Sequence, residues 1–363
     1  MLATTYILAP GSLRSWFPYF TELGDDDVTL AIGERPDVDV TGLAAELGPP
    51  GVGRQAVFYS AHHTLRRDRC LGDGLVLLGF DVHCQSHHAT ALGADKLVMK
   101  EFLRRNGLPT PAWRGHGGPI GGDGERTAPD GGHVVVKDRH GTQSAGTRLA
   151  RGNRCELRPG EFCEHYCSGV EYSVNVYRGE GRMVIFPAVW KGRTSLDLIP
   201  PWRRLRLCPY PDLPESVRSR LFRMAGRIAS AAAARGYLEV EFLVSDNEDI
   251  TVLEINPRVS GTMRLAAMAT GIPIFSVHRD ISLSGIAPAV RFAAEAPYQG
   301  PPLALPGDQV FATSRLTVAA GELPAVLAKL DWFRADLALP GSGRRSVRDV
   351  LADDGRSGIG VPQ

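Results

Sequence analysis

The first 92 residues alternate short apolar runs with segments of weaker, helix-like pattern. The apolar runs lie at 5–9, 28–32, 56–60 and 75–80. Runs of this length between turn-forming residues are typical of buried strands, and their alternation with helical segments is typical of a sheet with parallel strands. The pattern therefore predicts an N-terminal α/β domain over residues 1–92.

Three helices are predicted further along the chain. Apolar residues recur at three- and four-residue steps in 94–106, which Gly107 ends, and in 215–235, which Gly236 ends. A third helix is expected at 262–270. The apolar face of the first helix consists of Leu97, Val98, Phe102 and Leu103.

Strands are expected between these helices. Segment 133–137 is a short apolar run, 170–177 alternates apolar and polar residues, and 183–190 is predominantly apolar. The glycine-dense segment 115–132 is expected to be a loop.

The most informative pattern is a pair of β-rich segments, 238–244 and 250–256, around a polar turn at 245–249. This arrangement predicts an antiparallel hairpin. With the turn centred between positions 247 and 248, the two strands pair Glu239 with Asn256, Glu241 with Glu254, and Leu243 with Val252. On the other, apolar face, Val240, Phe242 and Val244 would lie opposite Ile255, Leu253 and Thr251.

Two carboxylates would therefore face each other across the hairpin. Cross-strand neighbours lie about 4.5–5.5 Å apart, and like charges at that separation destabilise a sheet. A divalent cation between Glu241 and Glu254 would remove this repulsion, and oxygen ligands suit magnesium. The alternative is that Glu239 and Glu241 form a solvated edge, while Glu254 pairs with Arg258.

Composition narrows the range of partners. The 363 residues carry 41 Lys and Arg against 40 Asp and Glu, for a net charge of +1. This balance favours neither nucleic acid nor a membrane surface as partner, and the length suggests two or three domains. No apolar stretch approaches the roughly 20 residues that cross a bilayer, and no signal peptide is predicted, so a cytoplasmic protein is expected.

Cysteine and histidine give no clear metal signal. The six cysteines are scattered without a CxxC pair, and reduced thiols are expected. Adjacent histidines occur at 62–63 and at 87–88. Because adjacent side chains point apart on a strand or a helix, metal binding at these pairs is not favoured.

Residues 254–258 (EINPR), following the acidic strand residue Glu241, resemble the metal-binding signature of the ATP-grasp superfamily. That superfamily includes D-alanine–D-alanine ligase, biotin carboxylase, the carbamoyl phosphate synthetase large subunit and amino-acid ligases. The resemblance covers about 88–280, with four motifs in the family's order. It implies an ATP-grasp fold of the α/β class, with α+β architecture in the catalytic part. The implied domains are an N-terminal pre-ATP-grasp domain (1–92), a small lid domain (93–165), a catalytic domain (166–290) and a C-terminal extension (291–363).

The resemblance implies two phosphate-binding lysines. Lys96 opens the segment similar to the family's DK…GLPxP motif, and Lys137 ends the strand whose lysine reaches the α- and β-phosphates. In the loop that follows, Ser144 and Gly146 are best placed to meet phosphate. The loop departs from the family's glycine-rich pattern, because 138–146 keeps only two glycines. Its Arg139 and His140 are candidates to replace backbone amides with positive charge.

Adenosine contacts are implied at the hinge that follows. By the resemblance, adenine would be held by backbone groups of Glu164, His165, Tyr166 and Cys167. Glu171 would accept hydrogen bonds from the ribose hydroxyls. Taken alone, a glutamate at the start of a strand is ordinarily an exposed residue.

The resemblance further implies that Glu241, Glu254 and Asn256 bind Mg²⁺, or Mn²⁺ in its place. Arg258 would point at the γ-phosphate. Lys191 is a candidate for the acceptor site or the γ-phosphate; alternatively, it is an ordinary solvated loop residue.

These features imply an ATP-dependent ligase that phosphorylates a small-molecule carboxylate and couples the acyl phosphate to an amine. Amino-acid-like substrates are expected by family analogy. Two alternatives remain: an ATP-grasp enzyme acting on bicarbonate or another small acid, and a non-catalytic nucleotide sensor. A homodimer is compatible with the sequence, which does not decide the oligomeric state.

Overall fold

The computed structural model describes residues 3–8, 13, 17–33, 35, 37–51, 54–116, 120–121, 132–142, 144, 146–151, 155–200, 203–298, 309–312 and 315–333. Most of the predicted glycine-dense loop at 115–132 lies outside these residues. The predicted boundaries between the four domains stay predictions.

The N-terminal part forms a four-stranded parallel sheet, as the sequence predicts, with strand order β2-β1-β3-β4. One predicted strand is wrong, because residues 75–77 of the apolar run at 75–80 end a helix and the next strand begins only at Asp81. Leu75 is buried while Leu77 is 87% exposed, and a short apolar run does not distinguish a strand from one side of a helix. The elements are β1 (Ala3–Leu8), η1 (Phe17–Tyr19), β2 (Val28–Ala31), α2 (Val40–Leu47), β3 (Arg54–Tyr59), η2 (His62–Thr64), α3 (Leu65–Leu77) and β4 (Asp81–His83).

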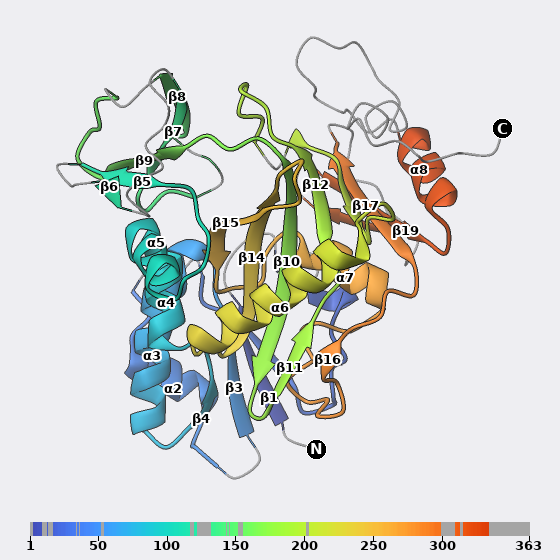
Figure 1. Ribbon diagram of the computed structural model, residues 1–363. Coiled ribbons are helices and arrows are strands. Elements are labelled where there is room, and N and C mark those ends of the chain that lie inside the picture. The colour runs from blue at the N-terminus through green and yellow to red at the C-terminus, as the bar shows by residue number, and fades with distance from the viewer. Residues whose placement is uncertain are drawn as a thin grey trace.

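A small antiparallel sheet forms a lid over the upper end of α5 (Figure 1). The predicted helix at 94–106 is observed as α5, which begins after Asp95; that carboxylate accepts hydrogen bonds from the amides of Leu97 and Val98. The predicted apolar face is wrong in one respect, because Val98 is 40% exposed, whereas Met99 and Lys100 are buried. The elements are α4 (His87–Ala94), α5 (Lys96–Arg105), β5 (Trp113–Gly115), β6 (Ile120–Gly121), β7 (His133–Asp138), β8 (Arg148–Arg151) and β9 (Glu161–His165).

A ten-stranded sheet forms the body, with the order β15-β14-β10-β12-β13-β17-β19-β18. Off this path, β11 pairs with β10, and β16 pairs with β11. Helix α6 crosses in front of it in Figure 1 and α8 lies at its upper right, whereas α7 packs on the opposite face, toward the N-terminal sheet. Chain beyond residue 291 therefore continues this sheet. The elements are β10 (Val170–Gly179), β11 (Arg182–Ile185), β12 (Val189–Arg193), β13 (Arg206–Cys208), α6 (Glu215–Ala231), β14 (Gly236–Val244), β15 (Ile250–Asn256), α7 (Met263–Thr270), β16 (Gly285–Ile286), β17 (Phe292–Pro297), β18 (Gln309–Ala312), β19 (Arg315–Ala320) and α8 (Leu323–Trp332).

Two further predicted elements are corrected. The single strand expected at 183–190 is divided into β11 and β12, with Pro187 between them; proline cannot donate a ladder hydrogen bond. The helix expected to reach residue 235 ends at Ala231, and Ala233 has a positive φ of 49°. Gly236 accordingly starts β14 rather than ending α6.

The predicted hairpin is confirmed where the acidic residues lie. Glu239 pairs with Asn256, Val240 with Ile255, and Glu241 with Glu254. Beyond Glu241 the predicted register is wrong by one residue: Phe242 pairs with Val252, Leu243 with Thr251, and Val244 with Ile250. A bulge at Leu253 absorbs the difference. Pro109 and Thr110 hold the neighbouring Val252, whose amide donates to the Pro109 carbonyl at 2.8 Å.

Two further properties of the described residues concern membrane spans and disulfide bonds. No helix in the described part of the chain is long and apolar enough to cross a membrane. All six cysteines lie in this part, and each is a free thiol.

Two histidines are packed among tyrosines between the N-terminal and central sheets. The His83 ring stacks on Tyr177 with centroids 6.0 Å apart, and the Tyr6 and His278 rings lie edge to face. Burial, reinforced by Arg235, lowers the pKa of His83 to about 4. Burial, reinforced by the neighbouring His83, lowers the pKa of His278 to about 3. Both histidines are therefore neutral in the folded protein at neutral pH.

Stability is expected to fall as pH drops from about 6.5 toward 4. An unfolded histidine binds its proton near pH 6.5, so acid stabilises the unfolded chain over this window, by about 3 kcal/mol for His83 alone. Denaturant unfolding at pH 7.5 and pH 5 should show a smaller loss in His83→Gln than in the wild type. The matched change His63→Gln, at an exposed side chain, should leave the loss unchanged; an equal loss in all three proteins would refute the assignment.

Candidate active site

A cleft of about 670 Å³ lies where the lid sheet, the central sheet and the C-terminal end of the N-terminal sheet meet. Two predicted residues, Lys96 and Gly146, do not line it, and Lys96 lies behind Glu254 instead. The others line it: Lys137, Ser144, Glu164, His165, Tyr166, Cys167, Glu171, Lys191, Glu241, Glu254, Asn256 and Arg258. The structure therefore brings together residues from three of the four sequence motifs, together with Lys191.

Each of the two facing carboxylates has an ammonium partner. Lys191 Nζ lies 2.7 Å from Glu241, and Lys96 Nζ lies 3.3 Å from Glu254. Burial alone would raise the pKa of Glu241, but the Lys191 charge lowers it below its ordinary value. The alternative of a solvated Lys191 is wrong, because this side chain is only 1% exposed.

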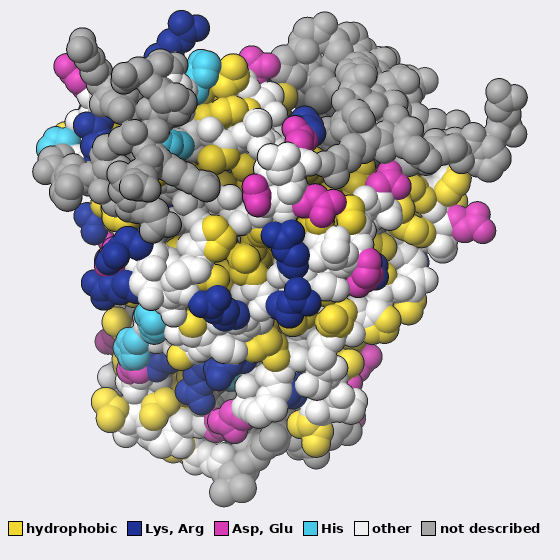
Figure 2. Space-filling view, viewed as in Figure 1, with side chains coloured by type: hydrophobic (Ala, Val, Ile, Leu, Met, Phe, Trp, Pro, Cys, Tyr) yellow, Lys and Arg dark blue, Asp and Glu magenta, His cyan; other side chains and the backbone are white. Residues whose placement is uncertain are grey.

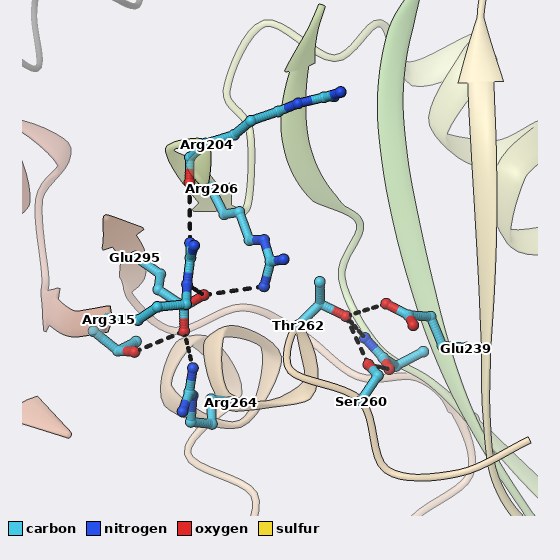
Figure 3. A network of polar contacts seen from close by, with 10 residues as sticks. Arg204, Arg206, Glu239, Ser260, Thr262, Arg264, Glu295 and Arg315 are labelled. Carbon is cyan, nitrogen blue, oxygen red and sulfur yellow. Dashed lines mark hydrogen bonds and ion pairs between the residues drawn. The ribbon is translucent and has the colours of Figure 1, made fainter. Parts of the chain in front are cut away.

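Glu239 orients the predicted amide ligand. The Asn256 amide nitrogen donates to Glu239 at 3.2 Å, which turns the amide oxygen of Asn256 away from Glu239. Thr262 holds the other Glu239 oxygen at 2.5 Å, and Asn175 donates to Thr262 at 3.0 Å. Figure 3 shows Glu239 and Thr262 of this network, together with Ser260. Glu239 is 3% exposed, so the interpretation of Glu239 as a solvated edge is wrong.

The donors around the facing carboxylates fit magnesium. Glu241, Glu254 and Asn256 offer only oxygen atoms once Asn256 is oriented by Glu239, and Mg²⁺ prefers few protein oxygens together with phosphate oxygens. Among the described residues there is no group of three or more His, Cys, Asp or Glu positioned for a metal. Two carboxylates and an amide are thus a site that substrate phosphates would complete.

Arg258 presents an unsatisfied guanidinium group to the cleft. Its Nη1 makes a 3.4 Å contact with the Val259 carbonyl, and its buried Nε has no hydrogen-bond acceptor among the described residues. The sequence alternative of a Glu254–Arg258 pair is not observed in this part of the chain, because Glu254 pairs with Lys96. A buried donor of this kind favours an anionic ligand.

A buried charge triad joins the lid to α5. Glu164 of β9 forms ion pairs with Lys137 of β7 and with Lys100 of α5, the latter at 2.5 Å. Although burial opposes ionisation, the two lysines lower the pKa of Glu164 to about 2. Burial would lower the pKa of Lys137, but Glu164, Glu254 and Glu241 together raise it. Lys137 therefore keeps its charge in the cleft.

The loop after Lys137 is anchored to the start of α5. Arg139 makes two hydrogen bonds to Asp95, at 2.8 and 2.6 Å, and His140 Nδ1 lies 2.8 Å from the Ala94 carbonyl. Lys96 donates to the Gly141 carbonyl. Through these contacts Arg139 and His140 anchor the loop to α5 and to the residue before it. The prediction that their positive charge replaces backbone amides in the cleft is therefore not supported.

The predicted hinge is an ordered strand end. His165 and Tyr166 donate their amides to the carbonyls of Ala112 and His133, at 2.9 and 3.0 Å. Glu171 is 7% exposed, so its interpretation as an ordinary exposed residue is wrong. Arg204 donates to one Glu171 oxygen at 2.7 Å, and Lys191 lies 3.8 Å from the other.

Sequence reasoning missed Lys100, and it missed Arg206 and Arg315, which gather around Glu295. Lys100 is fully buried although it belongs to a helix rich in surface charge. The polar positions Glu295 and Arg315 alternate with apolar residues on β17 and β19, but nothing local signals that they meet. Their only available signal was a charged residue inside an otherwise apolar strand.

Comparison with known proteins identifies similar sequences. Residues 203–285 match the family model described as "Carbamoyl-phosphate synthase L chain, ATP binding domain". The chain is 27% identical over 191 residues to the carbamoyl-phosphate synthase of Methanobrevibacter smithii, covering 51% of each protein. It is also 27% identical over 243 residues to the D-alanine–D-alanine ligase of Neisseria gonorrhoeae, covering 61% of this chain and 77% of that one. The chain thus spans about half the length of the first of these relatives.

Solved structures support the fold. The N5-carboxyaminoimidazole ribonucleotide synthetase of Thermotoga maritima superposes with a TM-score of 0.64 at 16% identity, covering 91% of this chain and 97% of that one. At this identity the likeness concerns the fold alone. It confirms the fold class predicted from the sequence.

Proposed function

Because this chain belongs to the ATP-grasp superfamily, we propose that it is a ligase that uses ATP to activate a carboxylate and joins it to an amine. The observation that supports this most strongly is the convergence of Glu241, Glu254, Asn256 and Arg258 on a cleft that Lys137 also lines. Acidic oxygen donors and cationic side chains on facing walls match the charge distribution of a metal-bound triphosphate.

Each residue is assigned a part of the reaction. We assign Lys137 to the α- and β-phosphates, Ser144 to a phosphate contact from the loop, and Arg258 to the charge that develops on the γ-phosphoryl group. Gly146 does not line the cleft and is given no phosphate contact. Magnesium, or manganese, held by Glu241, Glu254 and Asn256 would neutralise phosphate oxygens. Lys191, between Glu171 and Glu241, is placed to orient the acceptor carboxylate or the γ-phosphate.

We assign adenosine to the hinge segment, residues 164–167, and to Glu171 after it. The segment formed by Glu164, His165, Tyr166 and Cys167 lies along one wall of the cleft, where adenine can meet backbone groups. The ribose is assigned to Glu171, for which Arg204 and Lys191 compete. Lys96 acts through its contacts with Glu254 and Gly141, at the base of the lid.

The chemistry then proceeds in two transfers. A carboxylate oxygen of the substrate attacks the γ-phosphorus, and the bond to ADP breaks. The amine attacks the acyl carbon of the acyl phosphate and the C–N bond forms. Inorganic phosphate leaves with the electrons of the C–O bond, and the proton that the amine nitrogen loses passes to solvent. Amino-acid-like acids and amines are the proposed substrates, because one similar protein is a D-alanine–D-alanine ligase.

Arg258→Ala is expected to lower substrate-dependent phosphate release from Mg-ATP by about a thousandfold, since it removes a cation from the transferring phosphoryl group. Phosphate would be measured with pooled amino acids, bicarbonate and other small acids, with and without amines. Arg223→Ala, on the solvent-facing side of α6, is the matched control. Release that requires both an acid and an amine, and that fails in Arg258→Ala only, supports the proposal.

Three other outcomes of this phosphate-release experiment would favour a different function or contradict the proposed one. Release with bicarbonate alone would indicate an enzyme acting on that acid. ATP binding without turnover in any pool would favour a nucleotide sensor. An absence of ATP binding would contradict the proposed function altogether.

A further inference from the structure

One end of the cleft contains three arginines gathered around a single carboxylate. Arg206 of β13, Arg264 of α7 and Arg315 of β19 all pair with Glu295 of β17, Arg206 at 3.0 Å. Figure 3 shows the three guanidinium groups converging on this carboxylate from different elements. Thr317 donates to the same carboxylate at 3.0 Å, so both Glu295 oxygens accept two hydrogen bonds.

The cluster, defined as Arg206, Arg264, Arg315 and Glu295, carries more positive than negative charge. Three guanidinium groups against one carboxylate leave an excess of two positive charges within the cluster. The side chains are almost wholly removed from water, with exposed fractions of 10%, 5% and 7% for the arginines and 0% for Glu295. Burial, and repulsion from Arg206 and Arg264, lower the pKa of Arg315 to about 10 although Glu295 raises it. Such an excess of buried charge is unfavourable unless an anion joins it.

The positive groups are accessible from the cleft, whereas their counter-ion is not. Arg206, Arg264 and Arg315 line the cleft, and Glu295 lies behind them. The Nε of Arg206 is buried and has no acceptor among the described residues. Gly261 lies beside the cluster, where a methyl group at that position would be in van der Waals contact with Arg206 Nη1, at 3.4 Å. An anion entering the cleft would therefore meet donors rather than the Glu295 carboxylate.

Two charged neighbours among the described residues, Arg204 and Glu241, already have partners outside the cluster. Arg204 lies next to the cluster but points away from it toward Glu171, and its carbonyl accepts from Arg315 at 3.0 Å. Glu241 is the next carboxylate that the Arg206 charge influences, and it already has Lys191 at 2.7 Å. Two members of the cluster, Glu295 and Arg315, lie outside the segment that matches the family model.

We propose that the acid activated by this enzyme carries a second anionic group, and that the cluster binds this group while the reacting carboxylate lies toward Arg258. This inference rests on the proposed ligase function and narrows its substrate class to dianionic acids. Either a second carboxylate or a phosphate would supply the required charge, because guanidinium groups bind both.

Matched pairs of ligands test the cluster directly. Calorimetric titrations at constant ionic strength, with Mg²⁺ and a non-hydrolysable ATP analogue present, would compare aspartate with asparagine, glutamate with glutamine, and O-phosphoserine with serine. The dianionic member of at least one pair is expected to bind tenfold tighter or more. The pair that shows the preference distinguishes a carboxylate from a phosphate.

Variants at Arg206 then connect the preference to the cluster. Arg206→Gln should reduce the preference to threefold or less, Arg206→Lys should keep part of it, and Arg223→Gln, exposed on α6, should keep all of it. Circular dichroism and thermal melts would verify that each variant is folded. Equal binding within every pair, or a preference that survives Arg206→Gln, overturns the proposal.

The same ligands separate this proposal from the ligase function. ADP formation that is equally fast with mono- and dianionic acids would keep the ligase and reject the anion subsite. Binding that depends on Arg206, without ADP formation from any acid and amine, would keep the subsite and reject the ligase.

Discussion

Glu254→Gln is expected to lower ATP-dependent ADP formation by about a thousandfold at millimolar Mg²⁺. Glu254 lies opposite Glu241 on the hairpin, beside the side chain of Asn256 that Glu239 orients. Replacing one of two carboxylates removes a charge from the proposed metal site, and a loss of about 4 kcal/mol of transition-state stabilisation corresponds to three powers of ten in rate. Initial rates of ADP formation over a range of Mg²⁺ and Mn²⁺ concentrations would measure it.

A control variant and a threshold rate make this test of Glu254 specific. Glu180→Gln changes a carboxylate that is 94% exposed in the turn after β10, so it should leave both the rate and the metal dependence unchanged. If Glu254→Gln kept more than a tenth of the wild-type rate at the same Mg²⁺ concentration, the assignment of Glu254 as a metal ligand would be wrong.

The pairing of Lys191 with Glu241 and of Lys96 with Glu254 gives this site a further property. Each ammonium occupies a position near a carboxylate that the metal would need. Cation binding would therefore weaken both ion pairs and release positive charge toward phosphate oxygens. On this argument, Mg²⁺ and ATP should bind cooperatively, because each favours the same rearrangement of the lysines.

Local patterns predicted the site only where its residues are near in sequence. Glu239, Glu241, Glu254 and Asn256 lie within one hairpin, so strand alternation and the turn were enough to place them on one face. The strand pattern did not predict the bulge at Leu253; the neighbouring Val252 bonds to Pro109, which comes from another part of the chain. It changed the pairing of apolar residues without moving the acidic ones.

The arginine cluster shows why the other residues of the cleft could not be predicted from local sequence patterns. Its members come from β13, α7, β17 and β19, and only the strand order β13-β17-β19 brings them together. No periodicity in one segment encodes that order. Lys100 was missed for a related reason. Its partner Glu164 lies on β9, far from α5 in the sequence, so in the sequence Lys100 resembled the other charged residues of α5.

Glu164→Leu is expected to destabilise the protein by about 3–5 kcal/mol. The substitution removes the shared partner of Lys100, which is fully buried, and of Lys137. A buried charge that loses its partner retains its desolvation cost without compensation, whereas replacing both members of a pair by apolar residues is often tolerated. Lys100→Met combined with Glu164→Leu should therefore be more stable than Glu164→Leu alone. Urea denaturation of the two single variants and the double variant would give the coupling energy.

The matched control lies on the same helix. Glu101 also pairs with two cations, Arg104 and Arg105, but at the surface, so Glu101→Leu should not change the urea midpoint measurably. Additive effects of Lys100→Met and Glu164→Leu would refute a coupled buried triad. A favourable coupling would show that the lid strand carrying Lys137 is attached to α5 electrostatically. The position of Lys137, the proposed phosphate-binding lysine, would then depend on Lys100, to which we assign no phosphate contact.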